Sequence, residues 1–140
     1  PNGETWRGGG FRREHRAFFE RMIGKKYRVP GFLATSLQRE IATAFAFKAD
    51  MENPSHPCAI WRVTFDPRGK EHPEYRVKHM TWVSKTLIPG EQEYLFAPYS
   101  VFTVISAKFN TELTQPHEFT IQAAHDNKEE DECLPLTPWY

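Results

Sequence analysis

The sequence predicts an α+β fold with a strand-rich, sandwich-like core. Two segments with helical apolar spacing lie in the first 48 residues, and about five strand-like segments follow them. The regular alternation of strand and helix that builds a doubly wound parallel sheet is absent from this order. With 140 residues the chain has room for one domain, which we take as residues 1–140 with an acidic and proline-rich tail over 126–140.

The first half of the chain is expected to hold two strands and both helices. A short strand is predicted at Thr5–Arg7, directly before three glycines, and a helix at Arg12–Ile23. A second strand is predicted at Val29–Thr35, after which Ser36 is placed to cap a helix over Leu37–Lys48. The apolar face of this second helix is expected to carry Leu37, Ile41, Ala44 and Phe45.

The second half is expected to be almost entirely β-structure. Alternation of side-chain polarity and aromatic or β-branched content predict strands at Cys58–Phe65, Tyr75–Trp82, Glu93–Phe96, Val101–Phe109 and His117–Ala123. The segment Asn127–Glu132 is interpreted as a solvated acidic tail. Two alternatives stay open for Leu134–Trp139, which either docks on the body or leads into a further domain.

Composition excludes several classes of partner and cofactor. Eighteen basic residues balance eighteen acidic ones, so we expect no binding to nucleic acid or to an anionic membrane surface. No apolar run approaches the ~20 residues of a membrane helix. Cys58 and Cys133 are too few and too far apart for a disulfide framework or a zinc site, and no metal is expected. No targeting segment is recognised, and the start at Pro1 is interpreted as part of a longer chain.

Three short segments carry side chains suited to chemistry on a dinucleotide. The first is Trp6-Arg7-Gly8, in which a guanidinium can fork onto a pyrophosphate and a glycine lets a ligand approach the backbone. The second is Phe32-Leu33-Ala34-Thr35-Ser36, with hydroxyl groups at a strand-to-helix turn. The third is Glu91-Gln92-Glu93, with two carboxylates on one strand face about 6–7 Å apart. The spacings of a Rossmann glycine motif and of a phosphate-binding P-loop are both absent.

Each segment alone is more often an ordinary surface arginine, a helix cap or a solvated pair of glutamates. Their conjunction in this order resembles the arginine–serine–glutamate class of ADP-ribosyltransferases, which includes clostridial binary toxins, bacterial effectors and vertebrate ectoenzymes. Family members show Tyr-Arg-Gly, then Phe-x-Ser-Thr-Ser, then Glu-x-Glu before an apolar strand. The resemblance spans roughly residues 5–124 and implies an ADP-ribosyltransferase-like split β-sandwich, mainly antiparallel, with two flanking N-terminal helices.

The resemblance also implies a mono-ADP-ribosyltransferase that uses NAD+ as co-substrate. By this resemblance Arg7 holds the NAD+ phosphates, the Gly8 backbone binds the nicotinamide carboxamide, and Glu93 stabilises the positive charge of the transition state. Glu91 faces the acceptor side chain of a target protein, with arginine favoured because a guanidinium needs a carboxylate to orient it.

Two further positions carry weaker expectations under the same resemblance. Phe45 is placed to pack on nicotinamide, although a core position on its helix explains it equally well. Lys48 is placed to reach a phosphate, with a solvated helix end as the alternative. We expect a monomer, and the localisation stays open between an intracellular and a secreted effector.

One position departs from the family pattern. The serine that holds the catalytic glutamate in the family is Ala34 here, and Thr35 or Ser36 is then expected to supply the hydroxyl. Two other functions remain open from the sequence: an NAD+ glycohydrolase, in which water replaces the acceptor, and an inactive interaction module with the same fold. A β-rich lectin or peptide-binding domain would leave the three ordered segments as coincidence.

Overall fold

The computed structural model describes residues 3–52, 57–83, 93–110 and 115–138 of the chain, and side chains within these ranges except those of residues 49–52. Its two α-helices are α1 (Arg16–Arg21) and α2 (Arg39–Glu52). The strands are β1 (Glu4–Gly10), β2 (Lys26–Val29), β3 (Leu33–Ser36), β4 (Cys58–Thr64), β5 (Met80–Trp82), β6 (Glu93–Phe96), β7 (Ser100–Lys108) and β8 (His117–Ala123). Short 3-10 turns lie at Arg13–His15, Pro67–Lys70, Pro73–Tyr75 and Asn127–Glu129.

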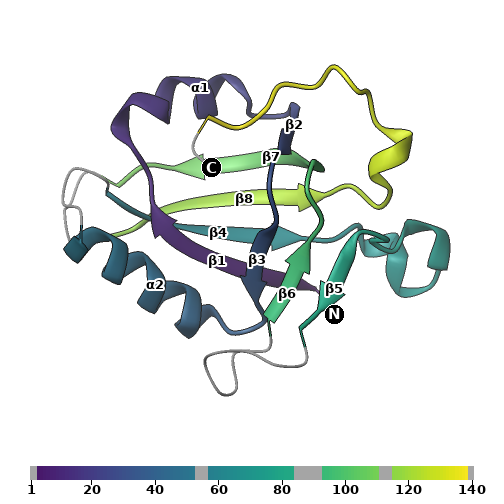
Figure 1. Cartoon of the computed structure of the whole chain (residues 1–140), viewed down its shortest axis with the longest axis horizontal. Coiled ribbons are helices and arrows are strands. Elements are labelled where there is room, and N and C mark those ends of the chain that lie inside the picture. The colour runs from purple at the N-terminus through teal and green to yellow at the C-terminus, as the bar shows by residue number, and fades with distance from the viewer. Residues whose placement is uncertain (1–2, 53–56, 84–92, 111–114, 139–140) are drawn as a thin grey trace.

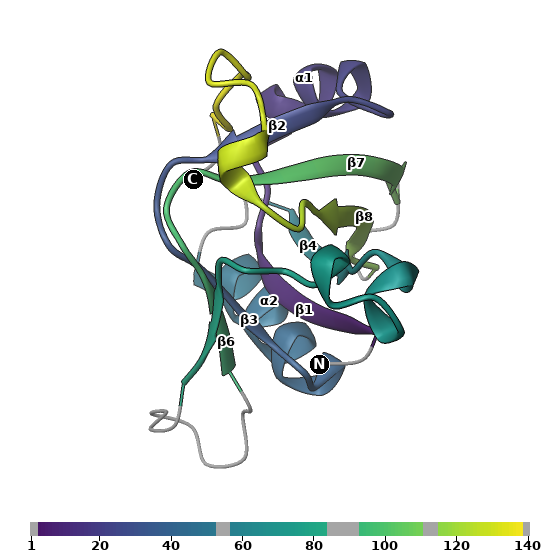
Figure 2. The ribbon, with the colours of Figure 1, turned by 90° about the vertical axis from the view of Figure 1, so that its right-hand side faces the viewer.

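The described strands form one hydrogen-bonded sheet in the order β2-β7-β8-β4-β1-β3-β6-β5. All neighbouring pairs are antiparallel except β4 and β8, which run parallel. The fold is therefore α+β with a mainly antiparallel sheet, as predicted from the sequence. Figure 1 shows β3, β6 and β5 running across the direction of β4, β7 and β8. Figure 2 shows the sheet from the side, with β2 and β7 toward one end and β6 toward the other.

The sheet divides where β1 meets β3. A single pair, Trp6 opposite Ser36, joins these two strands, whereas β1 pairs with β4 along its whole length from Glu4 to Gly10. Beyond Trp6 the two strands separate, and the Arg7 guanidinium spans the gap by donating a hydrogen bond from Nη1 to the Ala34 carbonyl at 3.2 Å. The separation of β1 and β3 beyond Trp6 divides the sheet into two parts, as expected for a split β-sandwich.

Helix α2 packs closely on β1 because small residues face each other. Ala42 and Ala46 are buried on the helix, and a Cβ built at Gly8 would lie 1.6 Å from the Ala42 carbonyl oxygen. The buried face of α2 therefore differs from the predicted one. Phe45 is 40% exposed, and Ala44 is also exposed, because the helix turns its alanines toward the sheet.

Two predicted strands were wrong in extent. The single strand expected at Val29–Thr35 is interrupted at Pro30, and its two parts become β2, which pairs with β7, and β3, which pairs with β1 and β6. Proline lacks the amide hydrogen that a continuous ladder needs. The strand expected at Tyr75–Trp82 is reduced to β5, because Pro73 begins a 3-10 turn upstream of it.

The alternating polarity of the strand predicted at Cys58–Phe65 indicates a half-buried strand, and this expectation is wrong for most of β4. Residues Cys58, Ala59, Ile60 and Trp61 are all buried in β4. One face of the strand lies in the main core, and the other lies under α2 beside Ala46 and Trp6. Neither cysteine forms a disulfide; Cys58 is buried and Cys133 is exposed.

The acidic segment Asn127–Glu132 exposes the side chains of Lys128, Glu129, Asp131 and Glu132, as expected, but its backbone is held against the body. Buried Arg28 on β2 donates from Nη1 to the Tyr99 carbonyl at 2.8 Å and from Nη2 to the Asp131 carbonyl at 2.9 Å. The Arg28 amide donates to the Pro135 carbonyl, and the Thr137 amide donates to the Arg28 carbonyl. Leu136 thereby forms a parallel β-bridge with Arg28, and residues 135–137 run along β2. For Leu134–Trp139, the alternative that the segment docks on the body is therefore confirmed for the described residues, which extend to Pro138.

The main core is largely aromatic and is built from residues of β2, β3, β4, β6, β7 and β8, together with Phe11 and Phe19. Phe11, Phe19 and Phe119 are almost fully buried, and the Phe19 and Phe119 ring centroids are 4.3 Å apart. Phe19 comes from α1, which was predicted over Arg12–Ile23 and is shorter because Arg13–His15 forms a 3-10 turn. No helix in the described part of the chain is long and apolar enough to cross a membrane.

Candidate active site

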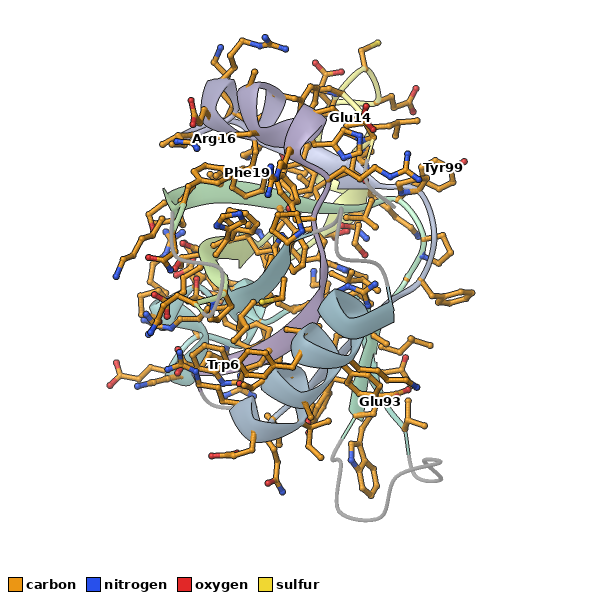
Figure 3. The ribbon with its side chains drawn as sticks, turned by 90° about the vertical axis from the view of Figure 1, so that its left-hand side faces the viewer. Trp6, Glu14, Arg16, Phe19, Glu93 and Tyr99 are labelled. Atoms are coloured by element: carbon orange, nitrogen blue, oxygen red, sulfur yellow. The ribbon has the colours of Figure 1, made fainter. Side chains whose placement is uncertain are left out.

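A pocket of about 280 Å³ lies where the sheet divides, between β1, β3, the start of β6 and α2. Figure 3 shows Trp6 and Glu93 on either side of α2 in that view. The pocket is lined by residues from all four elements: Trp6, Arg7, Gly8, Ala34, Thr35, Ser36, Ile41, Ala42, Phe45 and Glu93. All three sequence segments singled out above therefore contribute to one cavity.

Glu93 and Ser36 are direct cross-strand partners. β3 and β6 pair antiparallel with Ser36 opposite Glu93, and on the other side Ser36 lies opposite Trp6 of β1. Directly opposed residues have Cβ atoms about 4.5–5.5 Å apart and project to the same face of a sheet. Trp6, Ser36 and Glu93 thus form a row across three strands, on the face that α2 covers.

Ser36 also shapes the turn that leads into α2. Its Oγ accepts a hydrogen bond from the Gln38 amide at 3.0 Å, and α2 then begins at Arg39. The prediction that Ser36 caps a helix starting at Leu37 was wrong by two residues, because Ser36 still pairs as the last residue of β3. The Ser36 hydroxyl therefore lies where β3 meets the turn, in a residue that pairs with Glu93 of β6.

Thr35 and Ala34 have different surroundings from Ser36. The Thr35 hydroxyl donates to the Tyr94 carbonyl at 2.9 Å, and the side chain is buried. Ala34 lies two residues before Ser36 and shares its face, opposite Leu95 rather than Glu93. Of the two positions considered for the hydroxyl, Ser36 is the one whose register partner is Glu93.

Arg7 and Gly8 form the β1 wall of the pocket. Arg7 alternates in direction with its neighbours, and it lines both this pocket and a smaller cavity of about 100 Å³ that includes Tyr27, Trp61 and Thr137. Its guanidinium is therefore placed between the two cavities. Gly8 brings the backbone to the pocket surface, and α2 approaches it so closely that a Cβ there would lie 1.6 Å from the Ala42 carbonyl oxygen.

Helix α2 contributes residues that sequence reasoning missed. Ile41 and Ala42 line the pocket one helical turn before Phe45. Ile41 lies four residues and Ala42 three residues before Phe45, and residues at these spacings share one face of a helix. This spacing could have identified them from the sequence. Phe45 lines the pocket while remaining 40% exposed, so its ring is accessible to a ligand as well as to solvent. Lys48 is exposed further along α2 and is not among the lining residues.

Glu91 lies outside the described residues, so its position relative to Glu93 is not given by the structure. Strand β5, which precedes that segment, ends at Trp82, and the Val83 amide donates to the Glu93 carbonyl at 2.9 Å. Among the described residues no group of three His, Cys, Asp or Glu side chains is suited to hold a metal ion. The pocket chemistry is that of one guanidinium, one carboxylate, hydroxyl groups and aromatic rings.

Comparison with solved structures identifies the fold. The Vis toxin, an ADP-ribosyltransferase from Vibrio splendidus, matches with a TM-score of 0.66 and 14% identity over 100% of this chain and 55% of the toxin. The ADP-ribosyltransferase HopU1 of Pseudomonas syringae pv. Tomato DC3000 matches with a TM-score of 0.60 and 19% identity, over 86% and 44%. The C3 exoenzyme of Clostridium limosum matches with a TM-score of 0.56 and 18% identity, over 88% and 60%.

No protein-family model matches the chain, and no curated protein matches it in sequence. The chain spans about half the length of the solved structures that it matches. At these identities the likeness is one of fold, and the chain has the fold of bacterial mono-ADP-ribosyltransferases. The fold class that the sequence resemblance implied is therefore confirmed.

Proposed function

We propose that this domain is the catalytic domain of a mono-ADP-ribosyltransferase that transfers ADP-ribose from NAD+ to a protein side chain, with arginine as the favoured acceptor. The observation that carries the proposal is the single pocket that unites Arg7, Gly8, Ser36 and Glu93 at the split of a sheet with this fold. These residues are separated by up to 86 positions in sequence, and a fold that serves only as an interaction module has no need to bring them together.

The side chains that line this site suit the charge and the aromatic ring of NAD+. Two structures with this fold were solved with NAD or its carba analogue: a C3 exoenzyme from S. aureus and exoenzyme S from Pseudomonas aeruginosa. In this chain Arg7 would bind the pyrophosphate, because a planar guanidinium matches two phosphate oxygens. Gly8 would present its backbone to the nicotinamide carboxamide, and the exposed ring of Phe45 would pack on the nicotinamide face.

Glu93 has the central chemical role in the proposal. Its carboxylate would accept a hydrogen bond from the 2′-hydroxyl of the nicotinamide ribose and stabilise the positive charge that grows at the anomeric carbon. The bond from that carbon to nicotinamide breaks, and nicotinamide leaves as a neutral molecule with the bonding electron pair. Ser36, opposite Glu93 in the ladder, would hold the carboxylate in place and supply the hydroxyl that position 34 lacks.

The acceptor completes the transfer. A guanidine nitrogen would attack the anomeric carbon, and Glu91 would orient the guanidinium and accept the proton that it loses. The Vis enzyme was solved in complex with agmatine, a small guanidine compound, which supports a guanidine acceptor for this fold. If water attacks instead, the same pocket acts as an NAD+ glycohydrolase.

The test measures nicotinamide release from NAD+ with and without agmatine. Wild-type protein should release nicotinamide and form ADP-ribosyl-agmatine, and Glu93→Gln should lower the rate of release by about 10²–10³-fold because one preorganised electrostatic group is lost. Glu91→Gln should spare release and remove the adduct. Glu132→Gln, a change in the exposed tail, serves as the matched control and should leave both rates unchanged.

The outcomes separate the candidate functions. Glu93-dependent release without any adduct would favour a glycohydrolase or a different acceptor side chain. Release that is unaffected by Glu93→Gln would contradict the role of the pocket. No release by folded protein would favour the inactive interaction module.

A further inference from the structure

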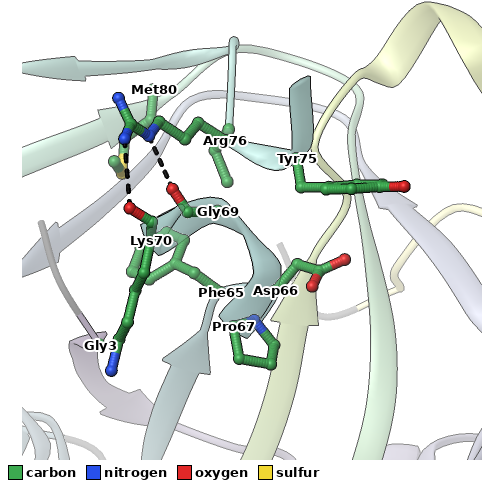
Figure 4. A pocket seen from close by; sticks show the side chains of 10 residues that line it. Gly3, Phe65, Asp66, Pro67, Gly69, Lys70, Tyr75, Arg76 and Met80 are labelled. Carbon is green, nitrogen blue, oxygen red and sulfur yellow. Dashed lines mark hydrogen bonds between the residues drawn. The ribbon is translucent and has the colours of Figure 1, made fainter. Parts of the chain in front are cut away.

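A second cavity in the described part of the chain lies away from the candidate active site. It has a volume of about 510 Å³ and lies between residues 65–77, the beginning of β1 and the beginning of β5 (Figure 4). It shares no lining residue with the pocket that contains Glu93. Its volume is in the range of cavities that hold a ligand or an anchoring side chain.

The inner wall of this cavity is apolar and well supported. Phe65, Val77 and Met80 line it and also pack against the main core. The Phe65 ring stacks on buried Phe96, with centroids 6.4 Å apart and an interplanar angle of 15°. Because Phe96 lies in β6 opposite Met80, the wall is attached directly to the strand that begins with Glu93.

The rim of the cavity carries positive charge. Figure 4 shows Arg76 bound to the backbone of the preceding turn: its Nε donates to the Gly69 carbonyl at 2.7 Å, and its Nη2 donates to the Lys70 carbonyl at 3.4 Å. Gly69 permits this approach, since a Cβ there would lie 3.3 Å from the Arg76 side chain. The second cation, Lys70, forms no side-chain ion pair or hydrogen bond within the ranges that the structure describes.

The one carboxylate that lines the cavity is neutralised. Asp66 accepts hydrogen bonds from the Arg68 guanidinium at 2.7 and 3.1 Å, and the guanidinium lies 3.8 Å from the Tyr75 ring centroid. The carboxylates of Glu71 and Glu74 are exposed nearby without lining the cavity. The cavity therefore presents two cations above an apolar wall, which suits an acidic side chain on an apolar stem.

Strand β5 connects this cavity to the active site. It is the edge strand of the described sheet, and Met80 at its beginning lies opposite Phe96, three positions or about 10 Å along β6 from Glu93. Trp82, at its other end, projects to the same face as Met80 and is 59% exposed, whereas Glu93 precedes Tyr94, the partner of Trp82, and projects to the other face. Because β5 is the edge strand of the described sheet, a partner beside it can contact both faces. A protein that reaches Glu93 would lie beside this edge, with Trp82 as an exposed aromatic contact.

We propose that the cavity bounded by Lys70, Arg76 and Met80, together with Trp82, is a docking surface for the acceptor protein. The cavity takes an acidic side chain of the acceptor, and Trp82 packs on the residues between that side chain and the modified one. This inference rests on the proposed transferase function, and it assigns the selection of protein acceptors to a surface distinct from the catalytic pocket.

The probe is a pair of synthetic, fluorescently labelled peptides. Each contains one acceptor arginine, and one peptide carries a glutamate four residues away where the other carries alanine. Binding is measured by fluorescence anisotropy without NAD+, and transfer is measured as kcat/KM with NAD+. Wild-type protein should bind the glutamate peptide about tenfold more tightly and modify it with a correspondingly higher kcat/KM.

The variants assign this preference to the cavity. Lys70→Glu should abolish the roughly tenfold preference and favour a third peptide with lysine in place of glutamate, while its rate with agmatine stays unchanged. Trp82→Ala should weaken binding of both peptides. Lys25→Glu changes the same charge on an exposed lysine beside β2, at the opposite edge of the sheet, and should alter neither binding nor transfer.

Each outcome bears on one of the two proposals. Equal binding of the glutamate and alanine peptides, or an equal effect of Lys25→Glu, would overturn the docking surface even when agmatine is modified. Selective binding of the glutamate peptide without modification of agmatine or of any peptide would support the surface and count against the arginine transferase.

Discussion

At the scale of single residues, Gly8 links the fold to the site. It presents its backbone to the pocket and faces α2 so closely that no side chain fits between them. A Cβ placed on its neighbour Gly9 would meet no atom within 4 Å, although both glycines lie in the same strand. The two residues therefore form a natural pair for testing what the glycine run contributes.

We expect Gly8→Ala to lower the free energy of unfolding by about 3 kcal/mol, because α2 must move away from β1 to admit the methyl group. Gly9→Ala should change stability by less than about 1 kcal/mol, in the stabilising direction if the strand gains from reduced backbone freedom. Urea unfolding followed by tryptophan fluorescence measures both. Equal effects of the two substitutions would contradict the close contact between Gly8 and Ala42.

At the scale of elements, β2 and the C-terminal segment form one unit. The buried Arg28 guanidinium donates to backbone carbonyls on both sides, including those of Tyr99 and Asp131. Lys26, two residues earlier on the same strand, reaches the same segment through an exposed ion pair with Glu130 at 2.8 Å. Removing a buried guanidinium leaves its carbonyl partners without a donor. This loss costs more free energy of unfolding than the loss of an exposed ion pair.

Arg28→Met should therefore lower the free energy of unfolding by about 2–4 kcal/mol and release residues 130–138 from β2. Lys26→Met should cost no more than about 1 kcal/mol. Hydrogen exchange detects release of the segment as faster exchange of the Arg28 and Thr137 amides, which donate across this bridge. Retained protection of these amides in Arg28→Met would show that the segment is held by other contacts.

At the scale of the whole molecule, His79 and His117 are expected to make the free energy of unfolding depend on pH. Burial lowers the pKa of His79 below its ordinary value, against an opposing effect of its hydrogen bond to the Ala124 carbonyl. Burial also lowers the pKa of His117, with Arg16 and Arg13 adding to the effect. The His117 Nδ1 accepts a hydrogen bond from the Asn110 amide, which only an unprotonated nitrogen can do.

Because both imidazoles have a lower pKa in the folded protein than in the unfolded chain, the unfolded chain binds more protons in the window below about pH 6.5. The free energy of unfolding should therefore fall as the pH drops from 7.5 toward 5. His79→Gln, which keeps a donor for the Ala124 carbonyl, should make this fall less steep. Urea titrations at several pH values measure the slope, and a stability that does not change over this window would refute the prediction.

The sequence by itself determined the elements whose signals are local. The strands at Glu93–Phe96 and His117–Ala123 begin and end where alternation and composition placed them. The order of the arginine, hydroxyl and carboxylate segments was also readable, and it pointed to the fold that the comparisons then confirmed. Such signals depend on residues within one or two turns of each other.

Only the tertiary structure decided which of these residues face one another. That Ser36 rather than Thr35 opposes Glu93 depends on the register between segments 57 positions apart, and a shift of one residue would reverse it. The exposure of Phe45 depends on which side of α2 meets the sheet, and this follows from the absence of a side chain at Gly8. Contacts between distant segments are set by packing of the whole chain, because local propensity favours a strand or helix without choosing its partner.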